Sequence, residues 1–227
     1  MAKLSTRSYA ILGLLAIRDW TTYELARQME RGLGDIWSAS RSMVFEEPKA
    51  LVALGLDTAS TEHVGQRTRT RYGITPDGLT ALRRWLAEPG APPAMQFEGL
   101  LKVLLADGSD SSTVRASLAA ARKWAAALRD TGREVAAEYA AGDGPFQERE
   151  HLVSVSFAFL WDFADLVERW ASWAETEAVT WPGGAVGNGG AGPRGAGREV
   201  FRRALGGQAA LPVAAAGLPG SAVTRPG

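Results

Sequence analysis

Arginine recurs at every second position in one short stretch of the chain, at Arg67, Arg69 and Arg71. The Thr-rich segments 56–62 and 68–74 alternate as strands do and are separated by a turn glycine, so a β-hairpin is expected here. On a strand the three side chains leave the same face. Cations gathered in this way suit contact with phosphates. The plainer alternative is a solvated edge strand that is protected by its charge.

A second group of polar side chains accompanies a predicted helix over residues 37–56. These short hydroxyls and cations are Ser40, Arg41, Ser42 and Lys49. The apolar residues expected to face a core recur at helical spacing and are Met43, Val44, Leu51 and Leu54. Such a helix can lie against a phosphate backbone, and Arg41 and Lys49 are candidates for reaching base edges. Gly55 is expected to end the helix in the left-handed conformation.

Two shorter helices are expected to position this one. The first, from about Ser5 to Arg18, is apolar around most of its circumference, as a buried central helix is. Thr21 and Glu24 then form a capping-box pattern for a second helix that runs to about Arg31. We expect the start of this helix, at Thr22 and Tyr23, to hold phosphates. Three short helices with a Gly-containing turn before the third are typical of a helix-turn-helix unit, and the hairpin would be its wing.

Charge and composition narrow the classes of function. Lys plus Arg and Asp plus Glu both number 25, so nucleic-acid binding requires a local basic patch. The chain has no cysteine and its two histidines are far apart in sequence, so neither a metal site nor a cofactor is expected. The acidic residues lack a partner nucleophile, and catalysis is not expected. The apolar segment near the N-terminus is too short to span a membrane, which predicts a soluble cytoplasmic protein without a membrane partner.

The second half of the chain predicts two long helices. Apolar residues recur at spacings of four and three between about Ser112 and Ala140, which indicates a heptad seam. Gly132 lies on this seam and suggests that two backbones approach closely there. A further helix over about 147–176 has a wide apolar face, which favours a homodimer over a monomeric helical hairpin. The residues expected at the dimer interface are Val114, Leu118, Leu128, Val135, Phe159, Phe163, Val167 and Trp170.

Aromatic residues in this half allow a second hypothesis, a pocket for a small planar ligand. Its expected lining is Met95, Phe97 and Trp161. Plain core packing is the more usual role of such residues.

The expected fold is mainly α, with an N-terminal winged helix-turn-helix of three helices and a two-stranded wing, followed by a helical dimerisation domain. A helix beginning at Thr75 and Pro76 completes the first domain, and a Pro/Gly-rich connector at 89–93 follows it. The predicted domains are residues 1–89 for DNA binding and 90–181 for dimerisation. Residues 182–227 are rich in Gly, Ala and Pro and are expected to be a disordered tail.

Residues 4 to 106 resemble the PadR family of winged-helix transcriptional regulators. The motifs that carry the resemblance are Ala10-Ile-Leu-Gly-Leu-Leu15, Tyr23-Glu-Leu25, Trp37-x-x-Ser40-x-x-x-x-Phe45, Ile74-Thr-Pro-x-Gly78 and Trp85-Leu-Ala-Glu-Pro89 with Glu98-x-Leu-Leu-Lys102. Phe45 stands where the family usually has Tyr, and Pro48 stands where it commonly has an apolar helix former. Within a helix, Pro48 would remove one amide hydrogen bond and kink the helix or make its N-terminal part less regular.

The resemblance implies a homodimeric repressor that binds a palindromic operator in double-stranded DNA and is released by a small-molecule effector. Within the third helix, we expect Ser40 to Phe45 to meet DNA and the part beyond Pro48 to serve mainly as core. The alternative function is a winged-helix protein-interaction module without specific DNA binding. Glu46 and Glu47 favour this alternative, because acidic side chains on a recognition helix repel phosphates.

Overall fold

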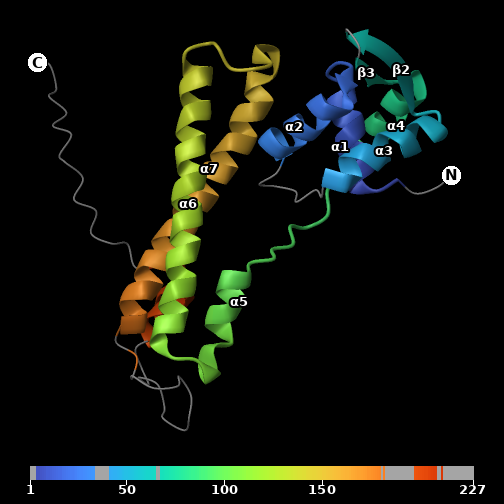
Figure 1. The fold of residues 1–227 in the computed structure, drawn as a ribbon. Helices are drawn as coiled ribbons and strands as arrows, with labels where there is room; N and C mark the ends of the chain where they lie inside the picture. Colours follow the sequence, from blue (N-terminus) through green and yellow to red (C-terminus); the bar gives the residue numbers. More distant parts are fainter. Residues whose placement is uncertain are drawn as a thin grey trace, which may run out of the picture. The chain divides into compact units, whose positions relative to one another are not determined.

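The protein is described from a computed structural model that covers residues 4–33, 41–64, 67–179, 181, 197–208 and 211. The chain forms two compact units, Met1–Ala94 and Met95–Gly227. The predicted mainly α fold with a winged-helix unit is confirmed (Figure 1). No helix in the described ranges combines the length and apolarity needed to cross a membrane.

The first unit begins with three helices and a very short strand. They are α1 (Thr6–Leu15), β1 (Trp20–Thr21), α2 (Thr22–Leu33) and α3 (Arg41–Ala53). Ser5 caps α1 through a hydrogen bond from the backbone N–H of Ser8, and Thr21 and Glu24 form the predicted capping box of α2. The side chains that these helices bury completely are Ile11, Leu12, Leu15, Leu25, Pro48 and Leu51. The centre of the unit is therefore apolar, as the circumference of the first helix predicts.

The third helix differs in part from its prediction. It continues through Pro48 to Ala53, and Gly55 follows in the left-handed conformation with φ 73°. Leu51 is buried as predicted, but Leu54 is half exposed because it lies beyond the last helical turn, so its assignment to the core stripe is wrong. Residues 34–40, including Ser40, and the side chains of Met43 and Val44 lie outside the described residues.

The wing is a hairpin of β2 (Asp57–Val64) and β3 (Arg67–Ile74). β1 pairs with the other edge of β3, which gives an antiparallel sheet in the order β1-β3-β2. α4 (Pro76–Leu86) follows at once, capped by Thr75 with Pro76 in its first turn as predicted. Tyr9 of α1 stacks on Trp85 of α4, with ring centroids 4.8 Å apart. Sheet and helices thereby enclose one core within this unit.

The second unit is built on two helices of 30 residues each, α6 (Ser111–Ala140) and α7 (Glu150–Val179). They pack side by side along their length (Figure 1). Shorter elements flank this pair and are α5 (Glu98–Leu104), η1 (Ala106–Gly108), η2 (Gln147–Arg149) and α8 (Arg198–Leu205). Of the predicted tail, 197–208 and 211 are described, and the remaining residues from 182 onward lie outside the described part.

Small residues on α6 and α7 let the two helices approach closely. Ala121 and Ala125 of α6 are buried against Val167 and Ala171 of α7 in one cluster. A second cluster joins Val114 and Leu118 to alanines near the end of α7. The heptad seam on α6 is therefore real, but it is covered largely by helices of the same chain.

Candidate nucleic-acid interface

The wing places its arginines in different environments. In the hairpin register Arg69 lies opposite Glu62, and Arg71 lies opposite Ser60. Arg69 is exposed. The backbone of Arg67 starts β3, but its side chain lies outside the described residues. Of the wing arginines whose side chains are described, Arg69 is therefore the one whose position suits a phosphate contact.

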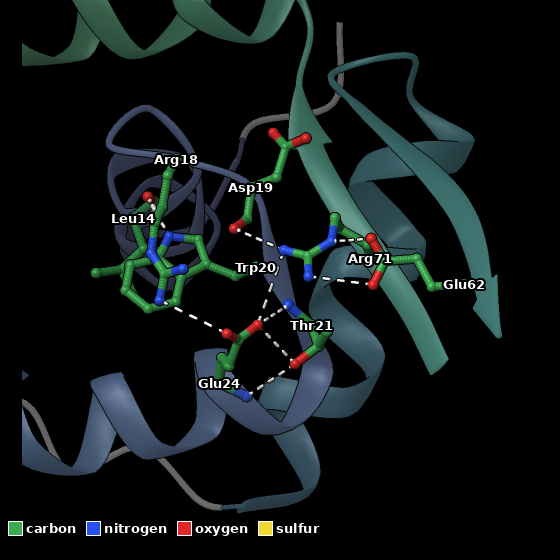
Figure 2. Close-up of polar contacts among 8 residues, drawn as sticks. All are labelled: Leu14, Arg18, Asp19, Trp20, Thr21, Glu24, Glu62 and Arg71. Atoms are coloured by element: carbon green, nitrogen blue, oxygen red, sulfur yellow. Dashed lines mark hydrogen bonds and ion pairs between the residues drawn. The ribbon is translucent and has the colours of Figure 1, made fainter. Parts of the chain in front are cut away.

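Arg71 is held by acidic and carbonyl groups of its own unit (Figure 2). Its Nε and Nη2 donate to the two carboxylate oxygens of Glu62, the second over 3.1 Å. Its Nη1 donates to the backbone oxygen of Asp19 over 3.2 Å and lies 3.9 Å from Oε2 of Glu24. The hydrogen bonds from Arg71 hold the pKa of Glu62 below its usual range. The charge of Arg71 is thus balanced by acidic groups of its own unit.

Glu24 joins this network to the start of α2. Its Oε2 accepts the backbone N–H of Thr21 over 2.7 Å and the Thr21 hydroxyl over 2.8 Å. The pKa of Glu24 is lowered, first of all by the hydrogen bond from the Thr21 backbone and also by Arg18 and Arg71. Arg18 in turn lies over the ring of Trp20, 3.8 Å from the centroid. The residues that begin α2 are therefore tied to the sheet and to the end of α1.

The exposed start of α2 carries Thr22 and Tyr23 as predicted. Tyr23 is 73% exposed, although it lies only two residues after the buried Thr21. An exposed aromatic hydroxyl in the first helical turn, where backbone N–H groups point outward, suits an oxygen of a phosphate group.

The recognition helix α3 presents fewer described side chains. Arg41 and Ser42 occupy its first turn, but their side chains lie outside the described residues. Phe45 is 46% exposed. Lys49 donates to Glu46 over 2.9 Å, and the hydrogen bond from this amine to Glu46 raises the pKa of Lys49. Lys49 thus has an acidic neighbour with which a DNA base would compete.

Glu47 is turned toward α1. It accepts hydrogen bonds from the hydroxyls of Ser8 and Ser5, the second over 3.5 Å. These serines begin α1, where the helix dipole favours an anion. Of the two acidic residues that favour a protein-interaction role, Glu47 therefore has an internal function that links α3 to α1.

The residues expected at a dimer interface fall into two groups. Val114, Leu118 and Val167 are buried within their own chain, so the prediction that they face a partner is corrected. Phe163 and Trp170 also pack against the cluster that contains Val167, and Leu128 and Val135 are half-buried. Phe159, by contrast, is 66% exposed.

The residues expected to line an effector pocket do not lie together. Phe97, which precedes α5, meets Trp170 edge to face with ring centroids 5.4 Å apart. Trp161 stacks on Phe157 at 5.8 Å instead. It lies nine residues before Trp170 on α7, which corresponds to about 13 Å along the helix. Met95 is largely exposed. Among the described residues, no group of three or more His, Cys, Asp or Glu side chains could hold a metal ion.

Sequence reasoning missed the Glu62–Arg71 pair, although its signal was present. The two segments predicted as strands imply a short hairpin, and in the observed register Glu62 lies two residues from the partner of Arg71. Such diagonal neighbours are within reach of long side chains. The sequence identified Glu24 as a cap but not its additional contact with the wing. That contact depends on β1, which is too short to give an alternating pattern in the sequence.

Comparison with known proteins connects this fold to regulators. No protein-family profile matches the chain. The chain is 32% identical over 96 residues to the negative transcriptional regulator PadR of Bacillus subtilis, which covers 41% of this chain and 53% of that protein. It is 31% identical over 86 residues to the probable transcriptional regulator Rv1176c of Mycobacterium tuberculosis, which covers 37% and 45%. The chain thus spans about half the length of the curated relatives that it matches.

Solved structures share the fold over a larger part of the chain. The PadR-like regulator BC1756 from Bacillus cereus matches with a TM-score of 0.63 and 16% identity, over 76% of this chain and 98% of its own. Bacillus subtilis PadR in complex with operator DNA matches with a TM-score of 0.62 and 20% identity, over 77% and 99%. The same protein in complex with p-coumaric acid matches with a TM-score of 0.58 and 19% identity over the same shares. In sequence over its matched part, and in its winged-helix fold, this chain is therefore similar to PadR-family regulators.

Proposed function

We propose that this chain is a sequence-specific DNA-binding transcriptional regulator. The observation that carries the proposal is the exposed wing residue Arg69 on the same winged-helix unit as the exposed α2 start at Tyr23. The unit offers a cation and a hydroxyl to the DNA backbone while α3 supplies base contacts. A structure of B. subtilis PadR with operator DNA supports this use of the fold. We propose no catalytic activity.

In this proposal the side chains have separate roles. Thr22, Tyr23, Ser40 and Ser42 hold phosphates, together with Arg67 and Arg69 of the wing. Arg41 and Lys49 reach base edges, and Phe45 contacts DNA beside them. Replacing Arg41 with Ala should reduce discrimination at particular base pairs by about 1–3 kcal/mol. Equal losses on specific and random DNA would assign Arg41 to the phosphate contacts instead.

The experiment is a salt series on Arg69→Gln, using the full chain and a duplex from the region upstream of its own gene. Loss of one phosphate contact reduces the slope of log K against log salt by about one and weakens binding to all sequences alike. Arg115→Gln is the matched control, because it removes one exposed arginine from α6. An unchanged slope for Arg69→Gln would exclude the wing contact. If the wild-type chain bound no DNA sequence, the alternative function as a protein-interaction module would be favoured. The exposed acidic residue Glu46 supports that alternative.

We also propose that the regulator is a homodimer, acts as a repressor and reads a palindrome, since a two-fold dimer presents two equivalent recognition helices. An exposed apolar stripe on α7 supports a partner, with Leu152, Val155, Phe159 and Leu166 at spacings of three, four and seven. Phe159→Asp should shift the mass in multi-angle light scattering from dimer to monomer. Ser154→Asp, at an exposed position on a different face of α7, should leave the mass unchanged. A dimeric Phe159→Asp protein would exclude this stripe as the interface.

A small planar effector is the remaining part of the proposal. The structure of B. subtilis PadR with p-coumaric acid supports it, because that ligand is bound by a protein of the same fold. Phe97 packs against Trp170 of α7, and Trp161 lies nine residues earlier on that helix. We therefore propose that the ligand contacts either Phe97 or Trp161 and not both. Calorimetric titration with p-coumaric acid of Phe97→Ala and Trp161→Ala separates the two positions. Binding that both substitutions leave unchanged would exclude this lining.

A further inference from the structure

Arg71 connects three segments that are distant in the sequence. Its guanidinium reaches Glu62 on β2, the carbonyl oxygen of Asp19 before β1, and Glu24 in the first turn of α2. Figure 2 shows these groups converging on the guanidinium from different elements. The side chain is only 28% exposed. Its planar fork matches a carboxylate in two places at once, which a lysine amine cannot do.

The position of Arg71 in the sheet explains why this contact orders the wing. β3 is the central strand, and Arg71 pairs with Thr21 of β1 on one side and Ser60 of β2 on the other. Thr21 is the capping residue of α2. The ion pair between Arg71 and Glu24 therefore spans the place where the wing meets the helix that carries Tyr23.

The charges around Arg71 oppose a direct DNA contact. Two carboxylates, Glu62 and Glu24, lie on the guanidinium, and a phosphate would have to displace at least one of them. Arg69, two residues earlier on the same strand, is exposed and bears the role that Arg71 lacks. The two arginines look equivalent in the sequence but differ in their surroundings.

We propose that Arg71 is a positioning residue that fixes the wing relative to the start of α2 and makes no phosphate contact of its own. The inference rests on the proposed DNA-binding function. Its direct structural consequence, ordering of the wing, can be measured without DNA.

Glu62→Gln is the decisive variant, because the two roles of Arg71 predict opposite signs. If Arg71 contacted phosphate, removing its acidic partner would release a cation and tighten binding. If Arg71 positions the wing, Glu62→Gln weakens binding despite the gain in net positive charge. We expect Arg71→Gln and Glu62→Gln each to weaken binding to the upstream duplex about tenfold, and the double variant to be no weaker than Arg71→Gln. Tighter binding by Glu62→Gln, or additive losses in the double variant, would overturn the proposal.

Amide hydrogen exchange of the full chain without DNA provides the second measurement. Arg71→Gln and Glu62→Gln should raise exchange in β2 and β3, whereas Arg69→Gln, which removes the same charge from the same strand, should not. Arg71→Lys keeps the charge without the fork and should fall between wild type and Arg71→Gln in both measurements. It also serves if Arg71→Gln fails to fold. If the Glu62→Gln variant exchanged its β2 and β3 amides at the wild-type rate, the positioning role would be contradicted. Failure of the wild-type chain to bind DNA would contradict the proposed function alone.

Discussion

The indole of Trp161 on α7 occupies the space where a side chain at Gly132 on α6 would extend. A Cβ added to Gly132 would lie 3.1 Å from Cε3 and 3.2 Å from Cζ3 of this ring. The sequence suggested that a second backbone approaches Gly132, and the neighbour is an aromatic side chain of the same chain instead. The guanidinium of Arg129 also lies over the Trp161 ring, 5.0 Å from its centroid.

Gly132→Ala should therefore be destabilising in the wild-type chain. Alanine gains about 1 kcal/mol of helix propensity over glycine, but the methyl group forces the ring away from Phe157 and Arg129. In a Trp161→Ala background the same substitution should stabilise by about 1 kcal/mol, because only the propensity effect remains. Urea unfolding of the wild type, the two single variants and the double variant measures this reversal of sign. If Gly132→Ala were stabilising in both backgrounds, the Trp161 ring would be free to shift.

Gly78→Ala should destabilise the winged-helix unit by about 1–3 kcal/mol. A Cβ at Gly78 would overlap the carbonyl oxygen of Leu56 and lie 2.9 Å from Cγ1 of Ile74. Both neighbours belong to the base of the wing, so the start of α4 would be pushed away from the sheet. The comparison is Gly13→Ala in α1, where a Cβ meets nothing within 4 Å and should add up to about 1 kcal/mol of stability. Equal thermal shifts of the two variants would contradict the close contact.

Asp57 makes stability depend on pH near neutrality. It begins β2, is 3% exposed, and neither carboxylate oxygen has a hydrogen-bond partner in the described part of the chain. Burial raises the pKa of Asp57 from 3.8 to about 7. The folded state therefore holds a proton that the unfolded state releases. The stabilisation is complete below pH 3.8 and is lost as the pH rises from there through 7, by roughly 4 kcal/mol in total.

Asp57→Asn removes this titration. The free energy of unfolding of the wild type should fall between pH 5 and pH 8 relative to that of the variant, whatever the offset between the two curves. Glu24 and Glu62 have lowered pKa values, so their contributions change at more acidic pH and do not enter this window. Parallel curves from pH 5 to 8 would show that Asp57 is ionised throughout.

Local signals in the sequence predicted the parts of the fold that depend on neighbouring residues. The capping box at Thr21 and Glu24, the left-handed Gly55 and the helix start at Thr75 each follow from the geometry of a few consecutive residues. The winged-helix order followed because its elements succeed one another closely along the chain.

Predictions failed where the deciding neighbour is distant in sequence. The spacing of Val114 and Leu118 indicates a buried face but does not distinguish a helix of the same chain from one of a partner. Likewise, period-two arginines predict a shared face, but only the folded sheet brings Glu24 to Arg71 and leaves Arg69 exposed. The candidate DNA-binding surface was thus predicted by region, whereas the division of roles among its arginines required the structure.

The alternation along β3 also limits how this wing can evolve. Tyr72 is 4% exposed and belongs to the core, whereas its neighbour Arg71 reaches the ion pairs of the other face. A single inserted residue within β3 would exchange these two positions and carry a guanidinium into the apolar interior. Homologous wings should therefore keep the length of β3 unchanged.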